Sequence, residues 1–171
     1  MGSVIKKERE IAMMYSFENR HLFDCTKEEK ESCLETIQQM ISLADIARNN
    51  FLFIDDMYTV ELIATMEDES EKKEFLEKQG QRKKEGWNNL QDEVDKSDDS
   101  FLKKGMQLLI DGVDLEPFIT IMNYSMVSSR CCGVSLLKKL LIFEGMISIR
   151  VGHSPRIIKE KLFSILGDEF A

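Results

Sequence analysis

The 171-residue sequence has few of the residues that interrupt regular structure, with only two prolines and nine glycines. A β-sheet needs frequent turns, and these two residue types typically mark them. Long stretches carry no such marker, while 43% of the residues are hydrophobic. A chain of this length suits one domain with a real core. We therefore expect a single all-α domain over residues 1–171, a multi-helix bundle with tight helix–helix corners and a charged, protruding helical arm.

Long apolar runs are also missing. A membrane-spanning helix needs about 20 mostly apolar residues, yet the most apolar stretch, residues 131–151, includes Lys138, Lys139, Glu144 and Arg150. No transmembrane segment is expected. The first ten residues are charged where a secretory signal would be apolar, and only four cysteines occur. These features predict a soluble, cytoplasmic protein with reduced thiols.

The sequence has little of what catalysis or metal binding requires. It holds two histidines, and His21, Cys25 and Cys33 lack the further paired ligands that zinc needs. It has no glycine-rich phosphate loop, and its carboxylates are dispersed along predicted helices. The net charge of -8 disfavours a nucleic-acid partner. We expect no enzyme activity, no metal, no cofactor and no nucleic-acid partner.

Helix signals are abundant in the first half of the chain. Thr26 and Glu29 form a predicted capping box, in which each side chain accepts a hydrogen bond from the other's backbone N–H. The helix that begins there is expected to reach about residue 48. After a kink, the apolar residues 51–54 are expected to continue it into the core. A further helix is predicted over residues 57–66.

Residues 67–99 are dense in charge and predict a long, mostly solvated helix, frayed near Gly80 and Gly86. A charged helix face is the simpler interpretation, and a basic docking patch at residues 82–84 is the alternative. Residues 1–99 would thus supply long N-terminal helices and the charged arm.

Residues 100–171 show helices that stop at a glycine and restart within a few residues. Glycine readily adopts the left-handed helix stop, and proline is tolerated at a first helical position. Two tight corners are therefore predicted, with Asp and Ser as caps, at Gly112, Asp114, Gly152, Ser154 and Pro155. The helix over residues 132–151 is expected to pack antiparallel to residues 101–111 or to the helix that starts at Thr26. It would bury Leu136, Leu137, Leu140, Leu141, Phe143, Met146 and Ile149.

The same region carries two motif-like segments. The first, residues 101–114, reads FLKKGMQLLIDGVD. The second reads EGMISIRVGHSPR over residues 144–156 and continues with KLFSIL over residues 161–166. These segments resemble the cytoplasmic region of MotA-like flagellar motor stator proteins, of the MotA/TolQ/ExbB proton channel family. The family's transmembrane spans have no counterpart, since only residues 126–139 stand where two spans would be. The resemblance therefore implies a domain that cannot conduct ions by itself, either a natural stator-like domain freed from the membrane or an engineered chain.

A weaker resemblance points to a partner. Residues 47–56 read ARNNFLFIDD and are similar to a family segment in which an Arg and an acidic residue engage the rotor protein FliG. Arg48 and Asp56 match those charges, and Phe51 replaces the family's usual glycine. Eight residues of helix would place the two charges about 12 Å apart near one face. The resemblance implies a FliG-like rotor or motor partner. The competing interpretation is that both charges are ordinary solvated groups, or that Asp56 caps a helix.

The function expected from these observations is protein–protein interaction without catalysis, by charge-complementary docking of surface helices. The alternative is an oligomerising helical scaffold without a motor role. It would self-associate as a homo-oligomer through residues 51–54 or through the stripe formed by Leu76, Trp87 and Val94.

Overall fold

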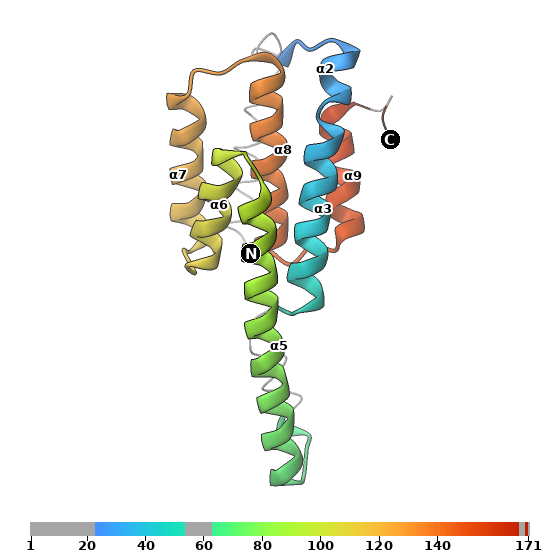
Figure 1. Cartoon of the computed structure of the whole chain (residues 1–171), viewed down its shortest axis with the longest axis vertical. Coiled ribbons are helices and arrows are strands. Elements are labelled where there is room, and N and C mark those ends of the chain that lie inside the picture. The colour runs from blue at the N-terminus through green and yellow to red at the C-terminus, as the bar shows by residue number, and fades with distance from the viewer. Residues whose placement is uncertain (1–22, 54–62, 168–169, 171) are drawn as a thin grey trace.

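The computed structural model describes residues 23–53, 63–167 and 170, and the regular structure in these residues is helical throughout (Figure 1). The helices pack against each other in a bundle, as predicted. The predicted helix over residues 57–66 lies largely outside the described residues. The described helices are α2 (Lys27–Glu31), α3 (Leu34–Asn49), α5 (Glu69–Lys96), α6 (Ser100–Ile110), α7 (Leu115–Ser128), α8 (Gly133–Arg150) and α9 (Pro155–Leu166).

Short-range hydrogen bonds set the helix starts. The capping box at α2 is present, with the Thr26 N–H donating to Glu29 Oε2 at 2.8 Å and the Glu29 N–H donating to Thr26 Oγ1 at 3.2 Å. The prediction of one unbroken helix to residue 48 is wrong, because α2 ends at Glu31 and α3 begins at Leu34. At the break, the Ser32 hydroxyl donates to the Glu29 carbonyl at 2.6 Å. Such side-chain bonds compete with the helical backbone pattern.

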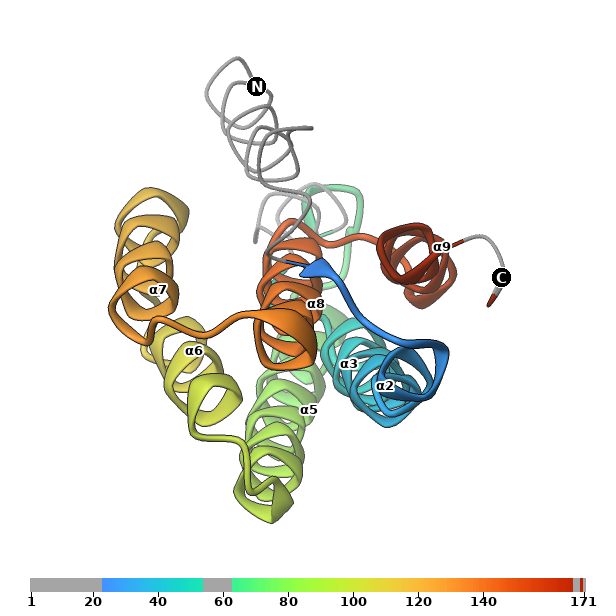
Figure 2. The ribbon, with the colours of Figure 1, turned by 90° about the horizontal axis from the view of Figure 1, so that it is seen from above.

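Helix α8 forms the centre of the bundle, with α3, α6, α7 and α9 around it (Figure 2). The side chains predicted to be buried on this helix are all buried. Its predicted orientation is wrong, because α8 runs parallel to both α3 and α6 (Figure 1). The reason is topological. Two chain reversals, one on each side of α7, separate α6 from α8, so the antiparallel neighbours of α8 are α7 and α9.

Two glycines allow α8 to approach its neighbours closely. A Cβ at Gly145 would lie 2.7 Å from Met40 Cε on α3. A Cβ at Gly105 on α6 would lie within 2.9 Å of Met122 Cε on α7 and closer still to Met146 of α8. Real Cβ contacts are longer than these distances, so the spacing of the helices depends on glycine, which has no Cβ, at both positions.

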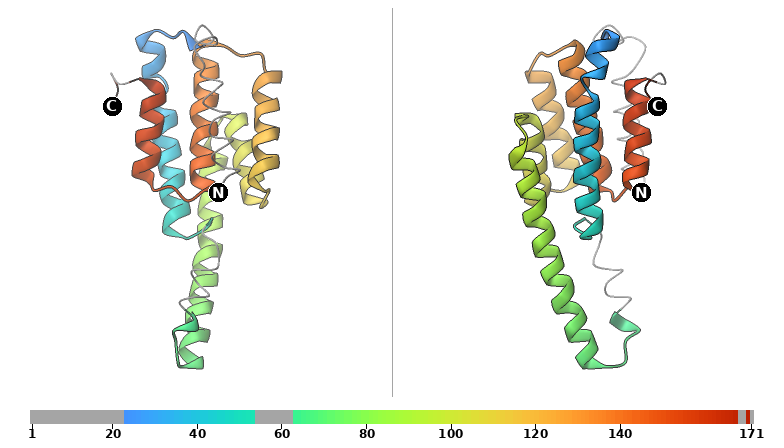
Figure 3. Two further views of the ribbon diagram at one scale, coloured as in Figure 1. Left: turned by 180° about the vertical axis from the view of Figure 1, so that it is seen from behind. Right: turned by 45° about the vertical axis from the view of Figure 1, so that its right-hand side comes forward.

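Helix α5 forms the predicted arm, and its N-terminal part extends beyond the ends of the other described helices (Figure 3). The predicted fraying is wrong, because α5 is continuous through both Gly80 and Gly86. Gly86 is buried, and a Cβ there would lie 2.3 Å from the Cβ of Asn50. This contact joins the arm to the chain that leaves α3.

Candidate interaction site

The ends of α6 and α8 share one hydrogen-bond pattern. Gly112 and Gly152 have φ values of 77° and 79°, in the left-handed region that favours glycine. After each glycine the next residue bonds back across the last turn, with the Val113 N–H donating to the Leu108 carbonyl at 3.0 Å. The His153 N–H donates in the same way to the Ser148 carbonyl at 2.9 Å. These bonds are those of a Schellman motif, which satisfies carbonyls at a helix end.

The residues at the starts of α7 and α9 differ in the capping hydrogen bonds that they form. Ser154 accepts a hydrogen bond from the Ile157 N–H at 3.4 Å, and Pro155 is the first residue of α9. Asp114 occupies the cap position of α7, but its side chain forms no capping hydrogen bond. The corner at Gly112 therefore depends on backbone geometry more than on its acidic cap.

The end of α3 has the same hydrogen-bond pattern with a phenylalanine in the glycine position. The Phe51 N–H donates to the Arg48 carbonyl at 3.1 Å, and the Leu52 N–H donates to the Ala47 carbonyl at 3.0 Å. Phe51 has a φ of 55°. This conformation costs roughly 1–2 kcal/mol for a residue with a Cβ. Phe51 thus adopts a backbone conformation that glycine would adopt without this cost.

This turn overturns the predicted geometry of the Arg48 segment. Residues 51–53 form a turn and do not continue a helix, because α3 ends at Asn49. The helical spacing of about 12 Å assumed between Arg48 and Asp56 therefore does not apply. Asp56 lies outside the described residues. Arg48 is exposed in the last turn of α3, where a cation interacts favourably with the helix dipole.

A cavity of about 520 Å³ lies beside Arg48. It forms where the end of α3, the following turn, the middle of α5 and the corner between α8 and α9 converge. We call it the Arg48 cavity. The residues that line it are Ala44, Ala47, Arg48, Asn49, Phe51, Phe53, Arg82, Ile149, Gly152 and His153.

Two arginines and two phenylalanines are among the residues that line this cavity, and Arg150 lies next to it in the sequence. The Arg82 guanidinium lies 5.4 Å from the centre of the Phe51 ring, and the Arg150 guanidinium lies 5.9 Å from the centre of the Phe53 ring. Both distances are within the range of a cation–π contact. Among the described lining residues there is no carboxylate, and within the described part of the chain neither Arg48 nor Arg82 forms an ion pair. The described residues therefore give the cavity a positively charged border in an acidic protein.

The aromatic wall is supported from α5. Phe53 packs edge-on against Trp87, with ring centres 5.2 Å apart and planes at 89°. The Asn50 side chain also donates to the Ile46 carbonyl at 2.8 Å. The turn that carries the aromatic residues is thus held by both the helix it leaves and the helix it faces.

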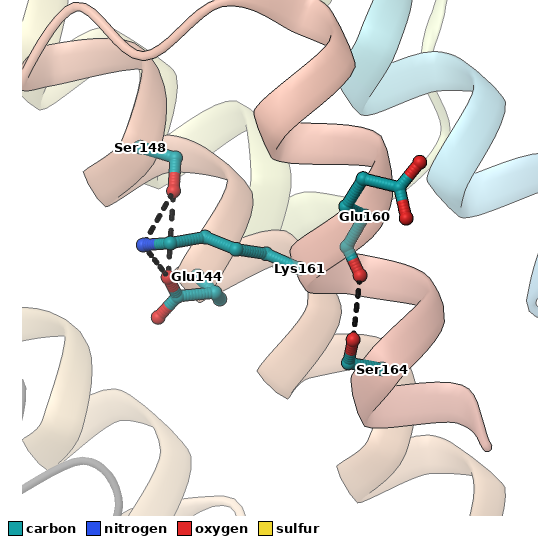
Figure 4. Close-up of polar contacts among 5 residues, drawn as sticks. All are labelled: Glu144, Ser148, Glu160, Lys161 and Ser164. Carbon is teal, nitrogen blue, oxygen red and sulfur yellow. Dashed lines mark hydrogen bonds and ion pairs between the residues drawn. The ribbon is translucent and has the colours of Figure 1, made fainter. Parts of the chain in front are cut away.

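A second polar group joins α8 to α9 (Figure 4). Lys161 Nζ lies 2.9 Å from Glu144 Oε1 and 3.4 Å from Ser148 Oγ, and the Ser148 hydroxyl lies 3.4 Å from the same carboxylate oxygen. On α9, the Ser164 hydroxyl donates to the Glu160 carbonyl at 2.8 Å. Glu144 and Lys161 both belong to the second motif-like segment, and their contact connects two helices of the bundle.

Sequence reasoning found part of the Arg48 cavity. It identified Arg48 as a docking residue and residues 82–84 as an alternative basic patch, but it did not bring the two together. It assigned Phe51 and Phe53 to a buried helix, and it gave His153 no role at this site. The one signal for this turn was position 51, where the resemblance leads to the expectation of a glycine and the chain has phenylalanine.

Comparison with known proteins gives no relative for this chain, since no protein-family model, no curated protein and no solved structure matches it. In residues 23–53 and 63–167, no helix has both the length and the apolar character needed to cross a membrane. The described residues also contain no cluster of three or more His, Cys, Asp or Glu side chains that could hold a metal ion.

Proposed function

We propose that this chain is a non-enzymatic, cytoplasmic protein-interaction module, similar to the cytoplasmic region of MotA-like stator proteins, that docks an acidic partner through Arg48. The observation that carries the proposal is the positively charged border of the Arg48 cavity. Arg48 and Arg82 come from different helices and both line this cavity, without an ion pair in the described residues. Exposed arginines bind carboxylates with two parallel hydrogen bonds, so this border suits an acidic protein surface.

The roles of the motif residues support the resemblance. Gly105 and Gly145 lie at close helix contacts, and Gly112 and Gly152 adopt left-handed helix ends. Each motif glycine therefore has a packing or turn role in this bundle. On this interpretation the motifs specify the helical arrangement, and the partner is selected by the separate charged surface around Arg48. A rotor protein of the FliG type is the partner that the resemblance implies.

The composition of the cavity favours binding over catalysis. Its described lining has no carboxylate, hydroxyl or thiol side chain that could act as a nucleophile. His153 is the one described lining residue whose side chain commonly transfers protons near neutral pH. Two arginines around an apolar floor can bind and orient an anion, so a docking role accounts for more of these residues than an enzymatic one.

An oligomerising scaffold would need exposed apolar side chains in the predicted stripe, and two of the three stripe residues already pack within the chain. Trp87 already packs on Phe53, and Val94 is buried. Of the predicted self-association stripe, Leu76 on the arm stays 49% exposed. Analytical ultracentrifugation over a concentration series would detect such self-association, and a Leu76→Asp variant would abolish it if the arm were the interface.

The docking proposal is tested by titrating the chain with a purified FliG rotor protein at low and high salt, using isothermal calorimetry. We expect binding at low salt that weakens at high salt, and at least about tenfold weaker binding for Arg48→Glu. Lys84→Glu is the matched control, because it makes the same charge change elsewhere on the surface. The proposal fails if no binding occurs, or if the two variants bind alike.

A further inference from the structure

Phe51 combines two features that packing alone does not explain. Its backbone lies in the left-handed region, at a φ of 55°, although glycine would adopt this helix end without strain. Its ring is only half-buried, and it lines the Arg48 cavity. Strained backbone that places a side chain at an open cavity is typical of functional sites.

The cavity offers space for an apolar side chain of a partner, and its arginines offer charge for the residues next to that side chain. Its volume of about 520 Å³ falls in the range of ligand-binding cavities. Ala44, Ala47 and Ile149 form an apolar floor, because all three are buried. An apolar side chain that entered from solvent would therefore contact hydrocarbon on the floor and the Phe51 ring at the side.

The arginines determine which residues of the partner can flank that side chain. Arg82 stacks on Phe51, which restricts its guanidinium to one side of the ring. Arg48 approaches the same cavity from α3. A carboxylate next to the inserted side chain could reach these guanidinium groups, whereas a lysine or arginine there would be repelled.

We infer that the Arg48 cavity is a recognition subsite for an acidic peptide segment of a protein partner, with one apolar side chain inserted against Phe51 and its flanking carboxylates on Arg48 and Arg82. This inference rests on the proposed docking function and adds to it the sequence character of the segment that docks. Phe51 is a specificity-determining residue, and its strained conformation holds the ring at the cavity.

The test uses the full chain and short synthetic peptides, with amide chemical shifts followed by NMR. The probe has one phenylalanine between aspartates, and two comparison peptides replace the phenylalanine by alanine or the aspartates by lysines. We expect the probe to shift amides of the residues that line the cavity. The alanine peptide should bind roughly tenfold more weakly, and the lysine peptide should not bind.

Variants separate recognition from folding. Phe51→Gly suits the left-handed backbone, so its melting temperature should not fall far, whereas its affinity for the probe should fall about tenfold. Phe51→Asn is a second variant, because asparagine also tolerates this conformation. Arg82→Glu should weaken binding, and Lys84→Glu should not, since two residues along a helix place Lys84 on nearly the opposite side.

Each outcome bears on the inference. If Phe51→Gly and Phe51→Asn bind the probe as tightly as the native chain, the inference is overturned. It is also overturned if free phenylacetate binds as tightly as the peptide, because the site would then take a small organic acid. If FliG binding depends on Arg48 but not on Phe51, the proposed docking function stands and this subsite fails. If neither residue affects FliG binding, both fail.

Discussion

Lys161 of α9 places its ammonium nitrogen 2.9 Å from Glu144 Oε1 of α8, and this ion pair is largely shielded from solvent. The Lys161 side chain is 32% exposed to solvent, and the Glu144 side chain is 13% exposed. Ser148, which is fully buried, lies 3.4 Å from both groups. The two charged residues are 17 positions apart in sequence and meet because the corner at Gly152 reverses the chain.

The first prediction concerns this ion pair. Lys161→Met should lower the free energy of unfolding by about 1–2 kcal/mol, because it leaves the mostly buried Glu144 carboxylate without its cation. Urea denaturation measures the change. The double variant with Glu144→Gln should recover part of the loss. Strict additivity of the two single effects would show that the residues do not interact.

The second prediction compares two glycines. Gly145→Ala should destabilise the protein by about 1–3 kcal/mol, because the new Cβ would meet Met40 of α3. Gly80→Ala is the control. A Cβ at Gly80 of α5 would have no neighbouring atom within 4 Å, so alanine's better helix propensity should stabilise the protein by about 0.5–1 kcal/mol. Thermal unfolding followed by circular dichroism distinguishes these opposite signs. Equal effects would contradict the close contact between α3 and α8.

The third prediction compares two aspartates at helix starts. Asp99 accepts hydrogen bonds from the Phe101 and Leu102 N–H groups at 2.8 and 2.9 Å, so Asp99→Ala should cost about 1 kcal/mol. Asp114→Ala should cost much less, because the Asp114 side chain forms no capping bond. Denaturant midpoints of the two variants give the comparison. A larger loss at Asp114 would mean that its side chain caps α7 in solution.

The fourth prediction concerns pH. Burial, more than any other cause, raises the pKa of the Cys33 thiol, and its sulfur donates a hydrogen bond to the Glu29 carbonyl at 3.6 Å. Because the pKa is raised in the folded state, the protonated thiol contributes to the free energy of unfolding. This contribution is complete below the thiol's ordinary pKa. It is lost as the pH rises through the folded value. Unfolding free energies above about pH 9 should therefore fall more steeply for the native chain than for Cys33→Ala.

Thiol labelling provides an independent check on Cys33. Cys132 is exposed and Cys33 is fully buried. A maleimide should therefore modify Cys132 in the folded protein, and Cys33 only after unfolding. Labelling of both thiols at similar rates under native conditions would contradict the packing at the junction of α2 and α3.

The sequence by itself determined the helical class, the capping box of Thr26 and Glu29, and the start of the last helix at Ser154 and Pro155. These features depend on residues that interact within one helical turn, so they can be identified without knowledge of the fold. The glycine at position 112 is similar, because a left-handed helix end is a local property of the backbone.

Tertiary structure decided the candidate site. Arg82 is 34 positions from Arg48, and the two line one cavity because Gly86 of α5 packs closely against the turn after α3. Phe51 looked like part of a buried helix because it is apolar, but its backbone turns where Phe53 can pack against Trp87. The direction of α8 relative to α3 also followed from the whole chain path. Contacts between distant segments select among locally acceptable conformations, and that selection placed the arginines together.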